Sequence, residues 1–170
     1  YDVIESPRAL YIVSRYVAGG DLQGHLRARA GTPLPVAQAV RLATQICRAL
    51  EQVHERGIAH RDVKPSNIFL DERGNAVLGD FGLAHVRAAA TPAEPEFVGT
   101  PAYAAPEQIY GRAVAASDLY ALGCVLYELT TGAPPFRGRS AAETLQMHLH
   151  AEPAAPRAHN PAVPAALDDL

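Results

Sequence analysis

Residues 60–67 read His60-Arg61-Asp62-Val63-Lys64-Pro65-Ser66-Asn67, and this short stretch concentrates side chains that can do chemistry. Asp62 can accept a proton, Lys64 can place a positive charge beside a phosphate, and Asn67 can offer an oxygen atom to a metal ion. Lys64 is also the only lysine in the chain. We therefore expect the segments on either side of this stretch to act as its scaffold.

A second acidic motif, Asp80-Phe81-Gly82, follows a predicted β-hairpin over residues 68–78. This hairpin is expected to bring Asp80 into the neighbourhood of Asp62. Taken singly, an Asp-Phe-Gly tripeptide or an Asn before a strand is most often a turn residue. Taken together, the motifs have a defined order, because Asp80 lies 18 residues after Asp62 and Ala105-Pro106-Glu107 begins 25 residues after Asp80. That joint spacing is not explained by turns alone.

These motifs resemble the C-terminal lobe of a eukaryotic-type serine/threonine protein kinase, and the chain is most similar to the bacterial members of that family. The resemblance covers nearly all 170 residues. It implies that Asp62 is the catalytic base and that Lys64 accompanies a Ser or Thr acceptor on a protein substrate. It also implies that ATP is the phosphate donor and that Asn67 and Asp80 bind Mg²⁺. Thr100 is expected to bond near Asp62 and Lys64 and to help seat the acceptor.

The same resemblance implies a nucleotide site near the start of the chain. Ser14 would be the gatekeeper at the adenine hinge, the backbones of Arg15 and Val17 would face the adenine edge, and Phe69 would pack beneath the base. Read without the family, Ser14 is an ordinary strand residue and Phe69 an ordinary core residue, and both alternatives remain open.

Further residues receive supporting roles from the resemblance. His60 and Phe81 are similar to members of the stacked spine of an active kinase, and Asp118 resembles a buried carboxylate that braces the catalytic loop. His54 is expected to be a hydrogen-bonded core histidine rather than a metal ligand. Thr91 is the only hydroxyl residue between Asp80 and Thr100. One hypothesis is that Thr91 is phosphorylated and that the phosphate pairs with Arg61 and orders the loop. The alternative is an unmodified, exposed threonine, and it remains open. The other histidines, which are expected to be surface or packing residues, are His25, His85, His148, His150 and His159.

The periodicity predicts an α+β domain that is mainly α-helical. Strands are expected around residues 3–4 and 10–13, and helices are expected over residues 21–29, 36–56, 117–131 and 141–150, with another beginning at residue 165. Residues 85–97 and 152–164 are predicted to be loops. In the helix over residues 36–56, the apolar face is predicted to contain Val36, Val40, Ala43, Cys47, Leu50, Val53 and His54. Residues 1–17 are expected to form the last N-lobe strands and the hinge, and residues 18–170 an incomplete C-lobe.

Composition excludes several other classes of protein. The hydrophobic fraction is 48% and the net charge is −3, which argues against nucleic acid or an anionic membrane surface as the main partner. No apolar run is long enough to span a bilayer. Cys47 and Cys124 lie far apart in apolar segments and are expected to be buried free thiols in a reducing, cytoplasmic compartment.

Two features depart from a complete kinase. The chain contains no G-x-G-x-x-G motif, and its single lysine, Lys64, cannot also be the strand lysine that binds the ATP phosphates. The 170 residues also end before the Arg that, in the family, pairs with the Glu of Ala-Pro-Glu, so Glu107 is expected to lack its usual ion-pair partner. We therefore expect the complete protein to transfer phosphate and these 170 residues alone to turn over little. The alternative is a pseudokinase, or kinase-homology module, that binds partners without catalysis.

Overall fold

The computed structural model describes residues 2–6, 9–80 and 99–168. The expectations above for Phe81, His85 and Thr91 therefore lie outside the described residues, as does the loop predicted over residues 85–97. Within the described part, the chain is mainly helical, and the prediction of an α+β fold dominated by helices is confirmed. The helices are α1 (Leu22–Ala28), α2 (Val36–His54), α4 (Pro106–Ile109), α5 (Ala115–Thr131), α6 (Ala141–His150) and α7 (Pro156–His159).

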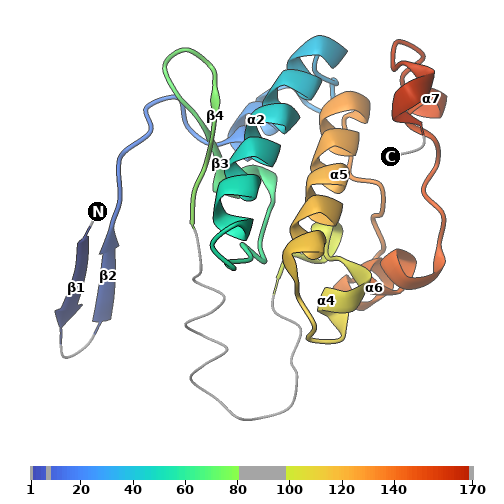
Figure 1. Ribbon diagram of the computed structural model, residues 1–170. Coiled ribbons are helices and arrows are strands. Elements are labelled where there is room, and N and C mark those ends of the chain that lie inside the picture. Colours follow the sequence, from blue (N-terminus) through green and yellow to red (C-terminus); the bar gives the residue numbers. More distant parts are fainter. Residues whose placement is uncertain (1, 7–8, 81–98, 169–170) are drawn as a thin grey trace.

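The chain opens with an antiparallel hairpin of β1 (Asp2–Ser6) and β2 (Ala9–Val13), as predicted. Figure 1 shows this hairpin standing away from the helices. Within the described residues its strands pair only with each other, and the side chains of Ile4, Tyr11 and Val13 are exposed. An isolated two-stranded hairpin of this kind is only marginally stable in water.

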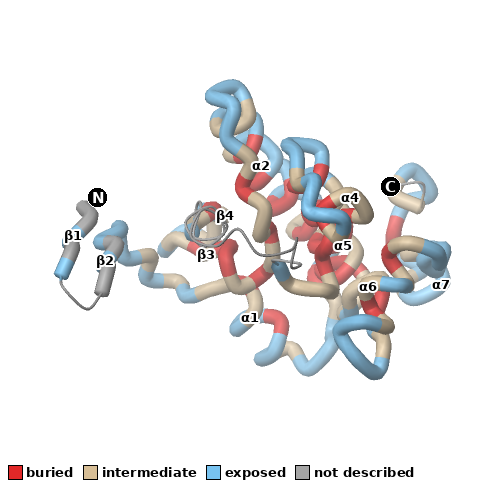
Figure 2. The backbone as a smooth tube through the Cα atoms, turned by 90° about the horizontal axis from the view of Figure 1, so that it is seen from below, coloured by how far each residue is buried: buried red, intermediate tan, exposed pale blue. Residues whose placement is uncertain are grey.

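The core lies between α2 and α5, which run side by side through the helical part (Figure 1). Figure 2 shows buried residues along the facing sides of both helices. The buried residues of α2 are Ala39, Leu42, Ala43, Ile46 and Leu50, and those of α5 include Ala121, Leu122, Val125 and Leu129. The burial of this continuous apolar stripe, at about 25 cal/mol per Å², is the main force that holds the two helices together.

The predicted apolar face of α2 is wrong in part. Val40 and Cys47 are exposed, while Leu42 and Ile46, which the prediction omitted, are fully buried. At 3.6 residues per turn, several overlapping i, i+3, i+4 series can be drawn through an Ala-rich helix. α5 packs against the face of α2 that contains Leu42 and Ile46, so these are the residues that become buried. Cys47 is therefore an exposed free thiol, contrary to expectation, and only Cys124 is a buried one.

α5 ends at Gly132, where the backbone needs a residue without a Cβ atom. Gly132 has a φ angle of 90°, in the left-handed region, and a Cβ atom there would collide with the carbonyl oxygen of Gly31. The neighbouring backbone bond runs from Leu34 N–H to the carbonyl of Leu129 at 2.8 Å. This close approach fixes the segment before α2 against the end of α5.

The C-terminal region differs from the prediction. A helical turn, α7 (Pro156–His159), occurs inside the expected loop, because Pro156 is well suited to the first position of a helix. Asn160 Nδ2 donates to the carbonyl of Thr130 at 2.8 Å, and this bond fastens the segment to α5. At residue 165 the chain forms a single 3₁₀ turn, η3 (Ala165–Leu167), within the described residues. No helix of the described residues is long and apolar enough to cross a membrane.

Candidate active site

The stretch over residues 60–67 connects α2 to the hairpin of β3 (Ile68–Leu70) and β4 (Ala76–Leu78), and its backbone is held by one buried carboxylate. Asp118, at the start of α5, is 1% exposed. Its Oδ2 accepts from His60 N–H at 2.7 Å, and its Oδ1 accepts from Arg61 N–H at 2.7 Å. His54 Nε2 lies 2.8 Å from Oδ2. The expected bracing role of Asp118 and the hydrogen-bonded state of His54 are both confirmed.

His60 joins this stretch to the end of β4. Its side chain is buried, and its Nε2 lies 2.8 Å from the carbonyl oxygen of Gly79. A carbonyl oxygen only accepts, so we assign the proton to Nε2. Nδ1 is then an acceptor, which agrees with its position 3.3 Å from the backbone N–H of Asp62. His60 thus couples the backbone before Asp62 to the backbone before Asp80.

Asp62, Lys64 and Thr100 form a cluster of side chains. Lys64 Nζ lies 2.6 Å from Asp62 Oδ2 and donates to Thr100 Oγ1 at 3.0 Å. Thr100 Oγ1 donates to Asp62 Oδ1 at 3.3 Å. The Asp62 and Lys64 side chains are 25% and 23% exposed, so solvent or a substrate can reach them. The structure therefore brings together three residues from segments that the sequence separates by up to 38 positions. Thr100 bonds to both Asp62 and Lys64, and its role in seating the acceptor stays a prediction.

Asn67 orients the same carboxylate through Oδ2, the oxygen that Lys64 also contacts. Its Nδ2 donates to the carbonyl oxygen of Asp62 at 2.8 Å and to Asp62 Oδ2 at 3.1 Å. Its Oδ1 takes part in neither bond. Asn67 lies in the 3₁₀ turn η1 (Pro65–Asn67), and its carbonyl oxygen accepts from Gly79 N–H at 2.9 Å. Asp80, which follows Gly79 in the sequence, is exposed, and its backbone has a positive φ angle of 58°.

The oxygen atoms available here fit magnesium. Mg²⁺ prefers oxygen ligands and usually takes one or two from the protein, with phosphate and water supplying the others. The Asn67 amide oxygen and the Asp80 carboxylate, brought to one end of the hairpin, form such a set. Among the described residues, no group of three or more His, Cys, Asp or Glu side chains could enclose a metal ion. The metal-binding role of Asn67 and Asp80 stays a prediction.

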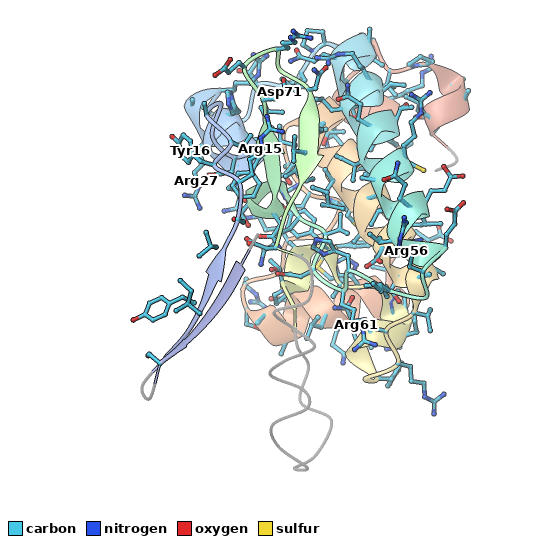
Figure 3. The ribbon with its side chains drawn as sticks, turned by 60° about the vertical axis from the view of Figure 1, so that its left-hand side comes forward. Arg15, Tyr16, Arg27, Arg56, Arg61 and Asp71 are labelled. Atoms are coloured by element: carbon cyan, nitrogen blue, oxygen red, sulfur yellow. The ribbon has the colours of Figure 1, made fainter. Side chains whose placement is uncertain are left out.

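The residues assigned to the nucleotide lie in β3 and in the segment that follows β2. Ser14 and Arg15 are exposed and Val17 is half-buried, and Figure 3 shows Arg15 and Tyr16 on the segment that connects the β1–β2 hairpin to the helices. That segment is tied to β3, because Gly19 N–H donates to the carbonyl of Leu70 at 3.0 Å. Phe69, the middle residue of β3, is half-buried. The roles of Ser14, Arg15, Val17 and Phe69 in nucleotide binding stay predictions.

A buried polar pair near Thr100 was missed by the sequence reasoning. Tyr103, in the 3₁₀ turn η2 (Pro101–Tyr103), donates its hydroxyl to Glu128 Oε2 at 2.6 Å. Burial raises the pKa of the Glu128 carboxyl above its usual range, and burial beside Glu128 also raises the pKa of Tyr103. The sequence did contain a signal for this pair, because a glutamate inside the apolar segment of α5 indicates a buried carboxyl that needs a hydrogen-bond partner. Asp118, at the start of α5, is the same kind of signal.

A second missed contact secures Arg61. Gln108 Nε2, from α4, donates to the carbonyl oxygen of Arg61 at 2.7 Å. The Arg61 backbone has a positive φ angle of 68°, an uncommon conformation for a residue with a side chain. Hydrogen bonds from Gln108 and to Asp118 therefore hold the residue before Asp62 in this conformation. Glu107, the neighbour of Gln108, accepts a hydrogen bond from Ser117 Oγ at 2.5 Å.

Comparison with known proteins identifies related sequences. The family described as Protein kinase domain matches residues 1–166. The serine/threonine-protein kinase PkaA of Streptomyces coelicolor is 45% identical over 162 residues, which cover 91% of this chain and 29% of that protein. PrkC of Bacillus subtilis is 39% identical over 172 residues (100% and 26%), and PknB of Mycobacterium leprae is 38% identical over 161 residues (93% and 26%). The chain thus spans about a quarter of the length of these relatives.

Proposed function

Because the chain belongs to the protein kinase family, we propose that the complete protein is a serine/threonine protein kinase, which transfers the γ-phosphate of ATP to hydroxyl groups of protein substrates. The observation that carries this proposal is the cluster of Asp62, Lys64 and Thr100. Its distances of 2.6, 3.0 and 3.3 Å join a carboxylate, a cation and a hydroxyl at an accessible place. Phosphoryl transfer requires such positioning and charge neutralisation more than covalent chemistry by the protein.

We assign the base to Asp62. Its carboxylate is fixed by Asn67 Nδ2 and Lys64 Nζ on Oδ2 and by Thr100 on Oδ1, so its orientation is defined before a substrate arrives. A substrate hydroxyl that hydrogen-bonds to this carboxylate can lose its proton to it as the phosphoryl group is transferred. The Asp62 side chain is partly exposed, so a protein substrate can approach it.

Lys64 and Thr100 would position the acceptor and the transferred group. The Lys64 ammonium is a point charge that can neutralise phosphate oxygens beside Asp62. Mg²⁺ held by Asn67 Oδ1 and Asp80 would neutralise further phosphate charge. Thr100 Oγ1 bonds to both Lys64 and Asp62 and so links the acceptor-seating segment to the base. The bacterial serine/threonine kinases among the relatives support a Ser or Thr acceptor.

These 170 residues do not supply every group that the reaction needs. Lys64, the only lysine, is engaged by Asp62 and Thr100, and no glycine-rich G-x-G-x-x-G motif occurs in the sequence. The α- and β-phosphates of ATP would therefore lack a lysine partner within this chain. We infer that phosphotransfer depends on additional residues of the complete protein. Two free cysteines fit a kinase domain placed in the cytoplasm.

The acceptor class is tested by incubating the complete protein with radiolabelled ATP, Mg²⁺ and a mixture of Ser-, Thr- and Tyr-containing peptides. Phosphoamino-acid analysis should find label on serine or threonine, and EDTA should abolish it. Label on tyrosine, or labelling that persists after Mg²⁺ is removed, would contradict the proposal.

A further inference from the structure

Gln108, in α4, is a buried amide to which the proposed chemistry assigns no role. Its side chain is 7% exposed. α4 follows η2, the turn after Thr100, and packs against both α5 and α6. Figure 1 shows α4 beside the lower end of α5. Gln108 therefore belongs to the part of the chain that carries Thr100, but its side chain reaches the segment that carries Asp62.

The hydrogen bond of Gln108 falls on the peptide unit directly before Asp62. Its Nε2 lies 2.7 Å from the carbonyl oxygen of Arg61, and a carbonyl oxygen accepts only, so the side-chain amide donates. The Arg61 carbonyl and the Asp62 N–H belong to one planar peptide unit. That N–H lies 3.3 Å from His60 Nδ1, which is a longer and weaker contact. Gln108 thus makes the shorter of these two bonds on the unit.

Arg61 has a backbone conformation that depends on such bonds. Its φ angle of 68° lies in the left-handed region, which residues with a side chain rarely adopt. A conformation of this kind persists only where the surrounding structure fixes it. Asp118 Oδ1 holds the peptide unit before Arg61 through the Arg61 N–H at 2.7 Å, and Gln108 holds the unit after it. Loss of the Gln108 donor would therefore release the second unit and leave the first one fixed.

The released unit is the one that sets the direction of the Asp62 side chain. Asn67 Nδ2 bonds to the carbonyl of Asp62 at 2.8 Å, so the backbone of Asp62 is held by Asn67 on its C-terminal side and by Gln108 on its N-terminal side. Rotation of the preceding peptide unit turns the Cα–Cβ bond of Asp62 and moves its carboxylate. A base must lie within hydrogen-bond reach of the proton that it accepts, so such a movement lowers the rate of the chemical step.

We propose that Gln108 is a positioning residue for the base of phosphotransfer, because its bond to the Arg61 carbonyl fixes the peptide unit before Asp62 and so directs the carboxylate toward the acceptor hydroxyl. The proposal rests on the proposed kinase function and assigns no contact between Gln108 and the reacting atoms. A residue that acts in this way changes kcat and leaves the binding of ATP and of the protein substrate as it is.

Two substitutions remove the donor in different ways. Gln108→Met keeps the length of the side chain but has no N–H group. Gln108→Asn keeps an amide, but it is one methylene shorter and ends short of the Arg61 carbonyl. Gln146→Met, at an exposed position of α6, is the matched control. The substitutions are made in the complete protein, and rates are measured well below the Tm of each variant.

With ATP, Mg²⁺ and a Ser/Thr peptide that the wild type phosphorylates, both Gln108 variants should lower kcat about tenfold, and the KM values for ATP and peptide should stay within about twofold of the wild type. Gln146→Met should have the kcat of the wild type. If Gln108 served only to support the fold, its substitution would lower Tm and leave the kcat of the folded enzyme unchanged.

Hydrogen–deuterium exchange, resolved to single amides by mass spectrometry, gives a readout that needs no activity. In both Gln108 variants the amide of Asp62 should exchange faster, because its peptide unit is released. The amide of Arg61 should keep the protection of the wild type, because Asp118 still holds it. A general loss of stability would instead accelerate the exchange of both amides.

A folded Gln108 variant with the kcat of the wild type would overturn the proposal. So would exchange at Asp62 that stays as slow as in the wild type, or that rises together with exchange at Arg61. A wild type that phosphorylates no Ser or Thr peptide would instead contradict the proposed function. In that case the contrast between the two amides still decides whether Gln108 holds the peptide unit before Asp62.

Discussion

The carboxylate of Asp118 accepts a hydrogen bond from the backbone N–H of Arg61 at 2.7 Å, although 57 residues separate them in the sequence. The residue that precedes Asp62 is thus fixed by a side chain from the central helix α5. Since the same carboxylate also accepts from His60 N–H, the geometry of the candidate base depends on a residue that never touches a substrate. The start of α5 is therefore part of the scaffold of the site.

Asp118→Ala should destabilise the domain strongly. It leaves two buried backbone N–H groups and His54 Nε2 without their acceptor, and loss of one partner in such a buried charged network costs about 3–5 kcal/mol. Thermal unfolding should show a fall in Tm of roughly 10 °C for a domain of this size. The exposed Glu72→Ala, on the β3–β4 turn, should change Tm by little. Equal Tm values for the two variants would show that Asp118 does not brace the loop.

Glu128→Gln should change stability in a pH-dependent way. Burial raises the folded-state pKa of Glu128 above that of the unfolded chain, which means that the folded state holds its proton more tightly. The wild type should therefore lose stability relative to Glu128→Gln as the pH rises above about 4.5, while glutamine keeps an acceptor for the Tyr103 hydroxyl. Tm values measured from pH 4 to pH 8 test this sign. A difference in Tm that is independent of pH, or that reverses, would refute the assignment.

The two cysteines should differ in reactivity. Cys47 is exposed on α2, whereas burial raises the pKa of the Cys124 thiol to about 12. Since the thiolate is the reactive form, iodoacetamide at pH 8 should label Cys47 in the native protein and label Cys124 only after unfolding. Peptide mapping by mass spectrometry distinguishes the two sites. Native labelling of Cys124 at the rate of Cys47 would mean that α5 is not packed as described.

The elements were largely predictable because their signals are local. α6 has the predicted bounds, and α5 begins two residues before the predicted start and ends at the predicted Thr131. The buried face of α2 was not predictable in the same way, since its Ala-rich sequence allows several stripes and only the position of α5 selects Leu42 and Ile46. α7 was missed because its Pro- and Ala-rich segment is also typical of a loop, although Pro156 suits the first position of a helix and the bond from Asn160 to Thr130 holds the turn against α5.

The candidate site was predictable where spacing within a motif fixes neighbours, as it does for Asp62, Lys64 and Asn67. Thr100 was placed by the resemblance, and the structure brings it to the same cluster. Contacts between side chains on different helices could not be predicted from the spacing within a motif. The pairing of Tyr103 with Glu128 and the packing of α6 against η2 depend on how the helices are arranged, which no short motif encodes.

The central claim is that Asp62 is the base of a phosphotransfer reaction, and Asp62→Asn in the complete protein tests it most directly. Asparagine keeps the size of the side chain. Its amide oxygen, in the place of Oδ2, can accept from Asn67, and its amide nitrogen can donate to Thr100 Oγ1, but it cannot take a proton. With ATP, Mg²⁺ and a Ser/Thr peptide, kcat should fall about 100-fold or more, while Tm stays close to that of the wild type. Glu72→Gln, which removes an exposed acid from the β3–β4 turn, should leave kcat unchanged. A folded Asp62→Asn protein that retains the kcat of the wild type would contradict the account.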